Sequence, residues 1–213
     1  MADIVADFAF PDQELEFLEQ LREGSDRAFA ALVSVYQRPI YNFVYRMLDD
    51  PSDAPDVTQE VFLKVFRNIG DFRGECSLKT WIYRIAVNEA SNLRRWFSRH
   101  RRQELSLDER QEGCPVLADV LADPQEDQYE QLLRQERMHA VETALSQVKE
   151  SFRIAVVLRD IEGLTYEEIA EVVQVSLGTV KSRILRGREA LKLRLLALYP
   201  DRAIAPGALQ AVE

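Results

Sequence analysis

The sequence has few of the residues that build metal sites and disulfide frameworks. It contains two cysteines, Cys76 and Cys114, and two histidines, His100 and His139, among 213 residues. The cysteines are far apart in the chain, and none of these four residues stands in a spacing typical of zinc ligands. We therefore expect no metal, no cofactor and no disulfide, and both cysteines are expected to be reduced.

Signals for membrane targeting and for catalysis are lacking too. No apolar run approaches the length of a membrane span, and Asp3 and Asp7 stand where a signal peptide needs lysine or arginine. No activated nucleophile, metal cluster or phosphate-binding loop can be recognised. These absences predict a cytoplasmic protein without membrane insertion, which is not an enzyme and has no catalytic residues.

Charge of both signs is present, and it is segregated along the chain. The formal net charge is −9, which argues against a uniformly basic nucleic-acid-binding surface. Residues 92–102 nevertheless hold five arginines and no acid, and residues 181–194 hold six cationic side chains and one acid. Residues 104–136 between them carry ten acids and two arginines. Any contact with DNA is therefore expected to come from two local basic patches.

The apolar pattern is helical almost throughout and shows no strand alternation. It predicts an all-α protein of two small helical domains joined by a flexible acidic linker. The expected ranges are 1–102 for the first domain, 103–124 for the linker, 125–199 for the second domain and 200–213 for a flexible tail. Helices are expected over residues 12–23, 26–48, 52–69, 78–99, 125–147, 151–161, 165–173 and 177–198.

The stretch GLTYEEIAEVVQVSLGTVKSRILRGR, residues 163–188, predicts a helix-turn-helix. Its first helix has apolar residues at helical spacing, and Ser176 is placed to cap the second. On the second helix, Val180 and Ile184 share one face, while Ser182 and Arg186 project from the other. Hydroxyls and arginines without interleaved acids suit phosphates and guanine edges, so a DNA-recognition helix is favoured over an ordinary solvated basic helix.

Two helices in the first half of the chain have unusual outward faces. In residues 52–69 the inward half is expected to hold valines with Ile69, Phe62 and Phe66, while Leu63 lies among charged residues on the other side. The outward leucine indicates a docking face, although single exposed leucines are ordinary.

In residues 78–99 an outward stripe joins an aromatic residue to amides and cations, as in proteins that bind single-stranded nucleic acid. Trp96 is expected to face inward on this helix. The loop at residues 72–80 offers small and polar groups that could hold an extruded base. The alternative is that Trp81, which leads the stripe, is simply a core aromatic.

Three motifs in this order carry a resemblance: DAPDVTQEVFLKVFRNI, FRGECSLKTWIYRIAVNEASNLRR and GLTYEEIAEVVQVSLGTVKSRILRGREAL. Together they resemble an extracytoplasmic-function sigma factor of bacterial RNA polymerase, of the sigma-70 family and sigma-E-like. The likeness covers about residues 18–196. It implies a promoter-specificity subunit that binds core polymerase, recognises the minus-thirty-five and minus-ten promoter elements, helps to melt DNA, and has a probable anti-sigma partner.

The resemblance also assigns residues to these contacts. Binding of core polymerase falls to Asp53, Asp56, Gln59, Glu60, Leu63 and Lys64. Reading of the minus-ten element falls to Arg73, Ser77, Lys79, Thr80, Trp81, Arg84, Asn88, Asn92 and Arg95. Reading of the minus-thirty-five element falls to Ser176, Thr179, Lys181, Ser182, Arg183, Arg186 and Arg188.

The sequence departs from the family pattern at two places. Gln174 stands in the turn where glycine is usual, and a left-handed backbone there would cost on the order of 1 kcal/mol. Gly187 stands in the recognition helix where alanine is usual, at a similar expected cost to helix stability. The alternative function is a two-domain helix-turn-helix regulator that is not a polymerase subunit. The two functions differ in their dependence on polymerase, because a repressor finds its operator without core enzyme.

Overall fold

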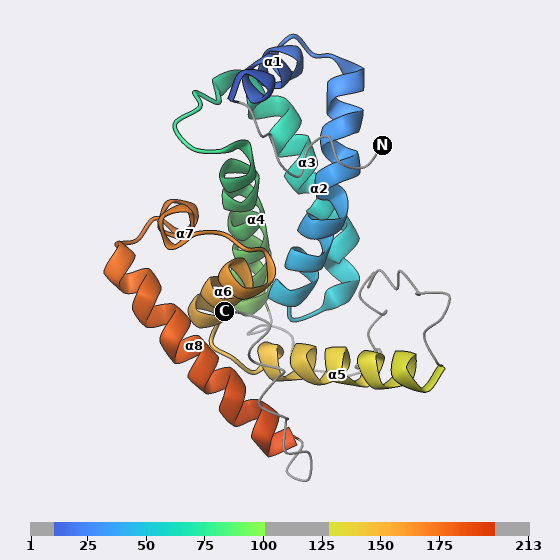
Figure 1. Ribbon diagram of the computed structural model, residues 1–213, viewed down its shortest axis with the longest axis vertical. Helices are drawn as coiled ribbons and strands as arrows, with labels where there is room; N and C mark the ends of the chain where they lie inside the picture. The colour runs from blue at the N-terminus through green and yellow to red at the C-terminus, as the bar shows by residue number, and fades with distance from the viewer. Residues whose placement is uncertain (1–10, 101–127, 199–213) are drawn as a thin grey trace. The chain divides into compact units, whose positions relative to one another are not determined.

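The computed structural model describes residues 11–100 and 128–198, and every regular element within these ranges is helical (Figure 1). The all-α prediction is thereby confirmed. The chain divides into two compact units, Met1–Val116 and Leu117–Glu213. The expected linker at 103–124 and the expected tail at 200–213 lie outside the described residues.

Within residues 11–100, unit 1 contains four α-helices, of which α2, α3 and α4 pack against one another, while α1 packs against α2. Ser25 begins α2 by accepting a hydrogen bond from the backbone N–H of Ala28 at 3.3 Å. Phe43 and Tyr83 meet edge to face in the core, with ring centroids 5.5 Å apart. The helices are α1 (Pro11–Arg22), α2 (Asp26–Met47), α3 (Ala54–Asn68) and α4 (Leu78–His100), and single 3₁₀ turns, η1 (Pro51–Asp53) and η2 (Ile69–Asp71), flank α3.

Unit 2 is built around α8, against which α5, α6 and α7 all pack. The expected helix at 151–161 begins as an α-helix and finishes as a π-helical segment, a rare widening of the helical turn. The elements are α5 (Gln128–Ser146), α6 (Glu150–Val156), the π-helical η3 (Val157–Ile161), α7 (Tyr166–Val173) and α8 (Leu177–Leu198).

Gly187 lies where α8 crosses α6, and the contact explains why the residue is glycine. A Cβ at this position would lie 2.5 Å from Cγ2 of Val156 and 3.0 Å from the carbonyl oxygen of Phe152. Both distances are shorter than van der Waals contact, and a valine side chain has little rotamer freedom in a helix. The expectation that Gly187 only weakens its helix was therefore incomplete, because the missing Cβ also permits the close approach of α6.

We expect Gly187→Ala to lower the free energy of unfolding by about 1 kcal/mol. Alanine gains about 1 kcal/mol in helix propensity, but overpacking typically costs about 1–3 kcal/mol. Urea denaturation followed by circular dichroism measures the change. Val156→Ala combined with Gly187→Ala should be more stable than the two single changes predict when added, because the clash is then relieved. A Gly187→Ala variant more stable than wild type would contradict the packing argument.

Candidate nucleic-acid interface

The predicted helix-turn-helix is confirmed as a fold in unit 2, from α7 through a short turn to α8. Thr165 and Glu168 form a reciprocal capping box at the start of α7: the Thr165 hydroxyl accepts from the Glu168 N–H at 3.1 Å, and the Glu168 carboxylate accepts from the Thr165 N–H at 2.8 Å. In the turn, Gln174 has φ 53° and ψ 50°, in the left-handed region. This conformation costs a non-glycine residue on the order of 1 kcal/mol.

Ser176 caps α8, as the sequence predicted. Its Oγ accepts a hydrogen bond from the N–H of Thr179 at 3.3 Å and lies 2.9 Å from the Thr179 hydroxyl. Val180 and Ile184 are buried on the side that faces the rest of unit 2. The predicted contact residues on the other side divide into Lys181, Ser182 and Arg186, which are exposed, and Thr179 and Arg183, which are half-buried. The start of α8 thus presents hydroxyls and cations to the outside.

Arg188 does not join this outward set. Its guanidinium donates to both carboxylate oxygens of Asp160, with Nε at 2.9 Å from Oδ2. The hydrogen bond to Asp160 raises the pKa of Arg188 further above its ordinary value, so the guanidinium stays charged and paired. The pair joins α8 to the π-helical segment and leaves 45% of the Arg188 side chain exposed, so its contact with DNA stays a prediction.

Leu185 belongs to the outward side of α8 and was missed by the sequence reasoning. Its side chain is 69% exposed and lies in the same two turns as Ser182 and Arg186. An apolar side chain in a recognition helix can contact the methyl group of thymine in the major groove. The signal in the sequence was its position directly before Arg186, on the side opposite the buried residues.

The loop before α4 in unit 1 is fixed at both ends. Arg22 of α1 donates a hydrogen bond to the carbonyl oxygen of Phe72, and the Phe72 ring packs on Trp81 with centroids 5.0 Å apart. At the other end, the Ser77 hydroxyl accepts from the N–H of Thr80 at 3.1 Å and caps α4. Thr80 itself is fully buried, so its predicted contact with the minus-ten element is not supported, and its hydroxyl pairs with that of Ser77 at 2.8 Å.

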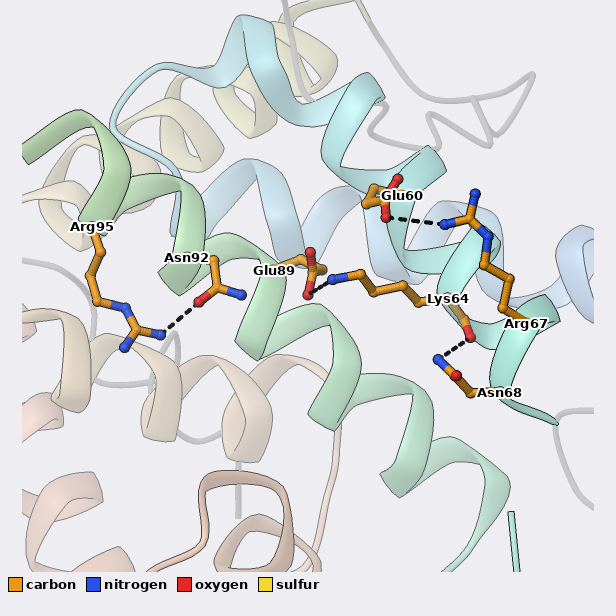
Figure 2. A network of polar contacts seen from close by, with 7 residues as sticks. All are labelled: Glu60, Lys64, Arg67, Asn68, Glu89, Asn92 and Arg95. Atoms are coloured by element: carbon orange, nitrogen blue, oxygen red, sulfur yellow. Dashed lines mark hydrogen bonds and ion pairs between the residues drawn. The ribbon is translucent and has the colours of Figure 1, made fainter. Parts of the chain in front are cut away.

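The predicted stripe along α4 is largely exposed. Asn88, Asn92 and Arg95 face outward, and the Arg95 guanidinium donates to the side-chain oxygen of Asn92 at 2.8 Å (Figure 2). Trp81 and Arg84 are half-buried. Trp81 is therefore neither a fully buried core residue nor a fully exposed ring on which a base could stack. The other predicted minus-ten residues are Arg73, which is exposed, Ser77, which is exposed, and Lys79, which is half-buried.

Trp96 was expected to face inward, and this was wrong. Its side chain is 48% exposed and makes an edge-to-face contact with Phe97, with ring centroids 5.0 Å apart. Every residue from Arg95 to Phe97 is exposed, whereas Leu93 is half-buried. The apolar periodicity of α4 therefore continues past the point where neighbouring helices cover it.

The outward face of α3 shows the expected mixture of charge and one leucine, together with an aromatic ring. Asp56 and Gln59 are exposed, and Leu63 is 37% exposed. Phe66 was assigned to the inward half, but it is 55% exposed and contacts the ring of Phe29 with centroids 4.7 Å apart. Phe29 of α2 covers only part of the ring, so the apolar part of this face is larger than the sequence predicted.

Polar contacts of α3 run along the helix itself and across to α4 (Figure 2). The Glu60 carboxylate lies 3.8 Å from the Arg67 guanidinium on the same helix. The Lys64 ammonium lies 2.7 Å from the Glu89 carboxylate of α4. Of the predicted polymerase-binding residues, Asp56, Gln59 and Leu63 are exposed and Glu60 is half-buried, whereas the charge of Lys64 is directed to a neighbouring helix.

Three aspartates gather where α3 begins. Burial raises the pKa of Asp53 above its ordinary 3.8, and the neighbouring charges of Asp50 and Asp56 raise it further. Asp50 also accepts hydrogen bonds from the N–H and hydroxyl of Ser52, and acids at a helix start are stabilised by the helix dipole.

We expect Asp53→Asn to leave the free energy of unfolding at neutral pH unchanged or slightly increased. The folded pKa of Asp53 is raised, so the ionised carboxylate destabilises the fold above that pKa, and protonation removes the effect as the pH falls. Asp53 makes no side-chain cap hydrogen bond to α3 that asparagine would lose. The difference between the variant and wild type, measured by urea denaturation, should therefore shrink toward about pH 4. A variant less stable than wild type at neutral pH would contradict the direction of this shift.

No group of three or more histidine, cysteine, aspartate or glutamate side chains within residues 11–100 and 128–198 could hold a metal ion. In the same ranges, no helix combines the length and apolar character that a membrane crossing needs.

Comparison with known proteins places the two units in one family. Residues 32–103 match Sigma-70 region 2, and residues 138–191 match Sigma-70, region 4. The chain is 38% identical over 195 residues to the RNA polymerase sigma-H factor of Pseudomonas aeruginosa, covering 89% of this chain and 97% of that protein. It is 36% identical over 180 residues to the ECF RNA polymerase sigma-E factor of Escherichia coli K12, covering 82% and 90%.

Solved structures agree in fold. The sigma factor RpoE of Bartonella quintana, solved with the anti-sigma factor NepR, matches with a TM-score of 0.63 at 22% identity, over 82% of this chain and 98% of that one. CnrH, solved with the cytosolic domain of CnrY, matches with a TM-score of 0.62 at 22% identity, over 89% and 99%.

Proposed function

The chain belongs to the extracytoplasmic-function sigma factors of bacterial RNA polymerase, and from this premise we propose which of its residues bind polymerase and which bind each promoter element. As a member of this family it is a promoter-specificity subunit that binds core polymerase and promoter DNA, and it is not an enzyme. The proposed domains are residues 1–102, which bind core polymerase and the minus-ten element, and residues 125–199, which bind the minus-thirty-five element.

The proposal rests above all on the different chemistry of two exposed helix faces, that of α8 in unit 2 and that of α4 in unit 1. The start of α8 offers Lys181, Ser182 and Arg186 on one exposed side, backed by buried Val180 and Ile184. A helix with this division fits the major groove of duplex DNA, where arginine binds guanine and hydroxyls bind phosphates. We assign reading of the minus-thirty-five element to these residues with Ser176, Thr179 and Arg183, and we add Leu185.

The loop and stripe of unit 1 suit unpaired DNA instead. Asn88 and Asn92 are exposed amides that can bind base edges, and Arg95 stands beside Asn92 with its guanidinium already oriented. Unstacked bases expose the edges and faces that such side chains bind. We assign capture of the melted minus-ten strand to this stripe, to Trp81 and Arg84 at its start, and to the loop residues Arg73, Ser77 and Lys79. Thr80 would act only by holding Ser77 in place.

The outward face of α3 is the proposed docking surface for core polymerase. Asp56, Gln59 and Glu60 surround Leu63, and Phe66 extends the apolar part of the surface. An apolar centre with a charged rim is typical of protein interfaces whose affinity comes from a few central residues. The acidic residues Asp53 and Asp56 add a negative edge suited to a cationic partner.

An anti-sigma factor is a further proposed partner, because RpoE of Bartonella quintana, which has a similar fold, was solved with the anti-sigma factor NepR bound. We also propose that the chain works in the cytoplasm, where the polymerase acts.

The test is transcription by purified core polymerase on genomic DNA, with and without this chain, followed by mapping of the transcript starts. A sigma factor should create a set of new starts that share two spaced promoter elements. A two-domain regulator would instead bind its operator in the absence of core enzyme and would add no starts to core polymerase alone. The second result would overturn the proposed function.

A further inference from the structure

Lys64 and Glu89 form an ion pair that joins α3 to α4, and the function described so far makes no use of it. The ammonium and carboxylate are 2.7 Å apart, and the Glu89 side chain is only 14% exposed, against 35% for Lys64 (Figure 2). A carboxylate this far from solvent is weakly screened by water and salt, so its charge acts over a longer distance than that of an exposed acid. Lys64 neutralises that charge.

Glu89 lies beside the residues that are proposed to bind the melted strand. It follows Asn88 directly and precedes Asn92 by three positions, so it is on the turn of α4 between two members of the stripe (Figure 2). Without a cation nearby, an acid at this place would repel the phosphates of any strand laid along α4. No other cation is recorded at an ion-pairing distance from Glu89 among the described residues.

The family resemblance assigns Lys64 to the polymerase-binding motif, but its ammonium points to α4. Glu60, an acid of the same motif, lies 3.8 Å from Arg67 and not beside Lys64 (Figure 2). A polymerase contact that drew Lys64 away would uncover the Glu89 carboxylate beside the strand. The two roles therefore conflict, and the observed pair favours one of them.

We propose that Lys64 serves strand binding rather than polymerase binding: it is a positioning residue that holds and neutralises Glu89, so that the stripe on α4 accepts a negatively charged strand. This inference rests on the proposed function of α4. It predicts that the effect of losing Lys64 depends on the presence of the Glu89 charge.

The experiment compares holoenzymes assembled from core polymerase and the full chain, as wild type, Lys64→Gln, Glu89→Gln and the double variant. The probe is a short fluorescein-labelled single-stranded DNA of randomised sequence, and its binding is followed by fluorescence anisotropy over a salt series, with core polymerase alone as the blank. Affinity for core polymerase is measured separately with labelled chain. Arg27→Gln on α2 removes the same charge from an exposed residue of unit 1 outside the site and serves as the matched control.

We expect Lys64→Gln to weaken strand binding by about three- to tenfold at low salt, since one uncompensated charge then faces the phosphates. Glu89→Gln should restore wild-type binding in the double variant, and affinity for core polymerase should stay within about twofold throughout, well below a hot-spot effect. Arg27→Gln should leave strand binding unchanged. Thermal melting followed by circular dichroism shows whether each variant is folded, and the double variant keeps the test valid if Lys64→Gln alone unfolds.

Two results would overturn the inference. One is a loss of core affinity in Lys64→Gln that Glu89→Gln does not repair, which would make Lys64 a polymerase contact. The other is an affinity for single-stranded DNA that is the same in Lys64→Gln and wild type. If the wild-type holoenzyme itself forms no specific transcripts, the proposed function fails instead, so the two failures can be told apart.

Discussion

We expect Leu63→Arg to weaken the binding of the chain to core polymerase by about 1–3 kcal/mol, or roughly 5- to 150-fold. Leu63 is exposed among the charged residues of the outward face of α3, and Phe66 extends its apolar part. A guanidinium there would have to be desolvated against the apolar surface that the leucine contacts in the complex. The helix itself should tolerate the change, because arginine has a high helix propensity and the position faces solvent.

Titration of labelled chain with core polymerase measures the loss, and urea denaturation verifies that the fold persists. Leu15→Arg is the matched control, because Leu15 is an exposed leucine of unit 1 that lies on α1 rather than on the proposed docking surface. Equal affinities for wild type and Leu63→Arg would remove the docking surface from α3. Equal losses in Leu63→Arg and Leu15→Arg would show a general effect of added charge.

The second large effect concerns Arg186. Replacement by alanine should cost about 1–3 kcal/mol in binding of the holoenzyme to an intact duplex promoter, and it should relax the preference at one upstream base pair. Arg186 is exposed on the first half of α8, one turn after Ser182. Lys192→Ala removes the same charge from an exposed position later on α8, and it should change upstream sequence preference far less.

Asn88→Ala should fail in a different way from Arg186→Ala. Asn88 lies in the stripe suited to unpaired bases, so its loss should spare duplex binding and impair strand opening. A template whose start region is already melted should therefore restore transcription by Asn88→Ala and not by Arg186→Ala. Equal rescue of both variants would contradict the assignment of duplex reading and strand capture to separate surfaces.

Helices and their caps could be predicted from the sequence because they depend on local chemistry. Leu177–Leu198 was expected with the bounds that α8 has, and Ser176 caps it. Thr165 caps α7 in a capping box that the short sequence TYEE already encodes. Such features depend on residues within one turn of each other, so the local sequence is enough to predict them.

The sequence predictions failed or were incomplete where the surroundings of a side chain depend on a segment distant in the sequence. Phe66 and Trp96 both fit the apolar periodicity of their helices, but their side chains are 55% and 48% exposed. The pairing of Arg188 with Asp160, which lies on a different element, could not be expected from periodicity either. Gly187 similarly owes its identity to Val156 of another helix. Periodicity gives the direction of a side chain, and only packing shows what lies in that direction.

The loop before α4 has its ends fixed and its middle exposed. Arg22 holds the carbonyl of Phe72 at one end and Ser77 caps α4 at the other, while Arg73 and Glu75 between them are exposed. Substitutions at the exposed positions leave the anchors intact, so they can change the side chains offered to a melted base without changing where the loop begins and ends. On the proposed function, promoter preference can therefore change while the scaffold stays stable. The residues between the anchors are the positions to vary in order to redirect this protein to new promoters.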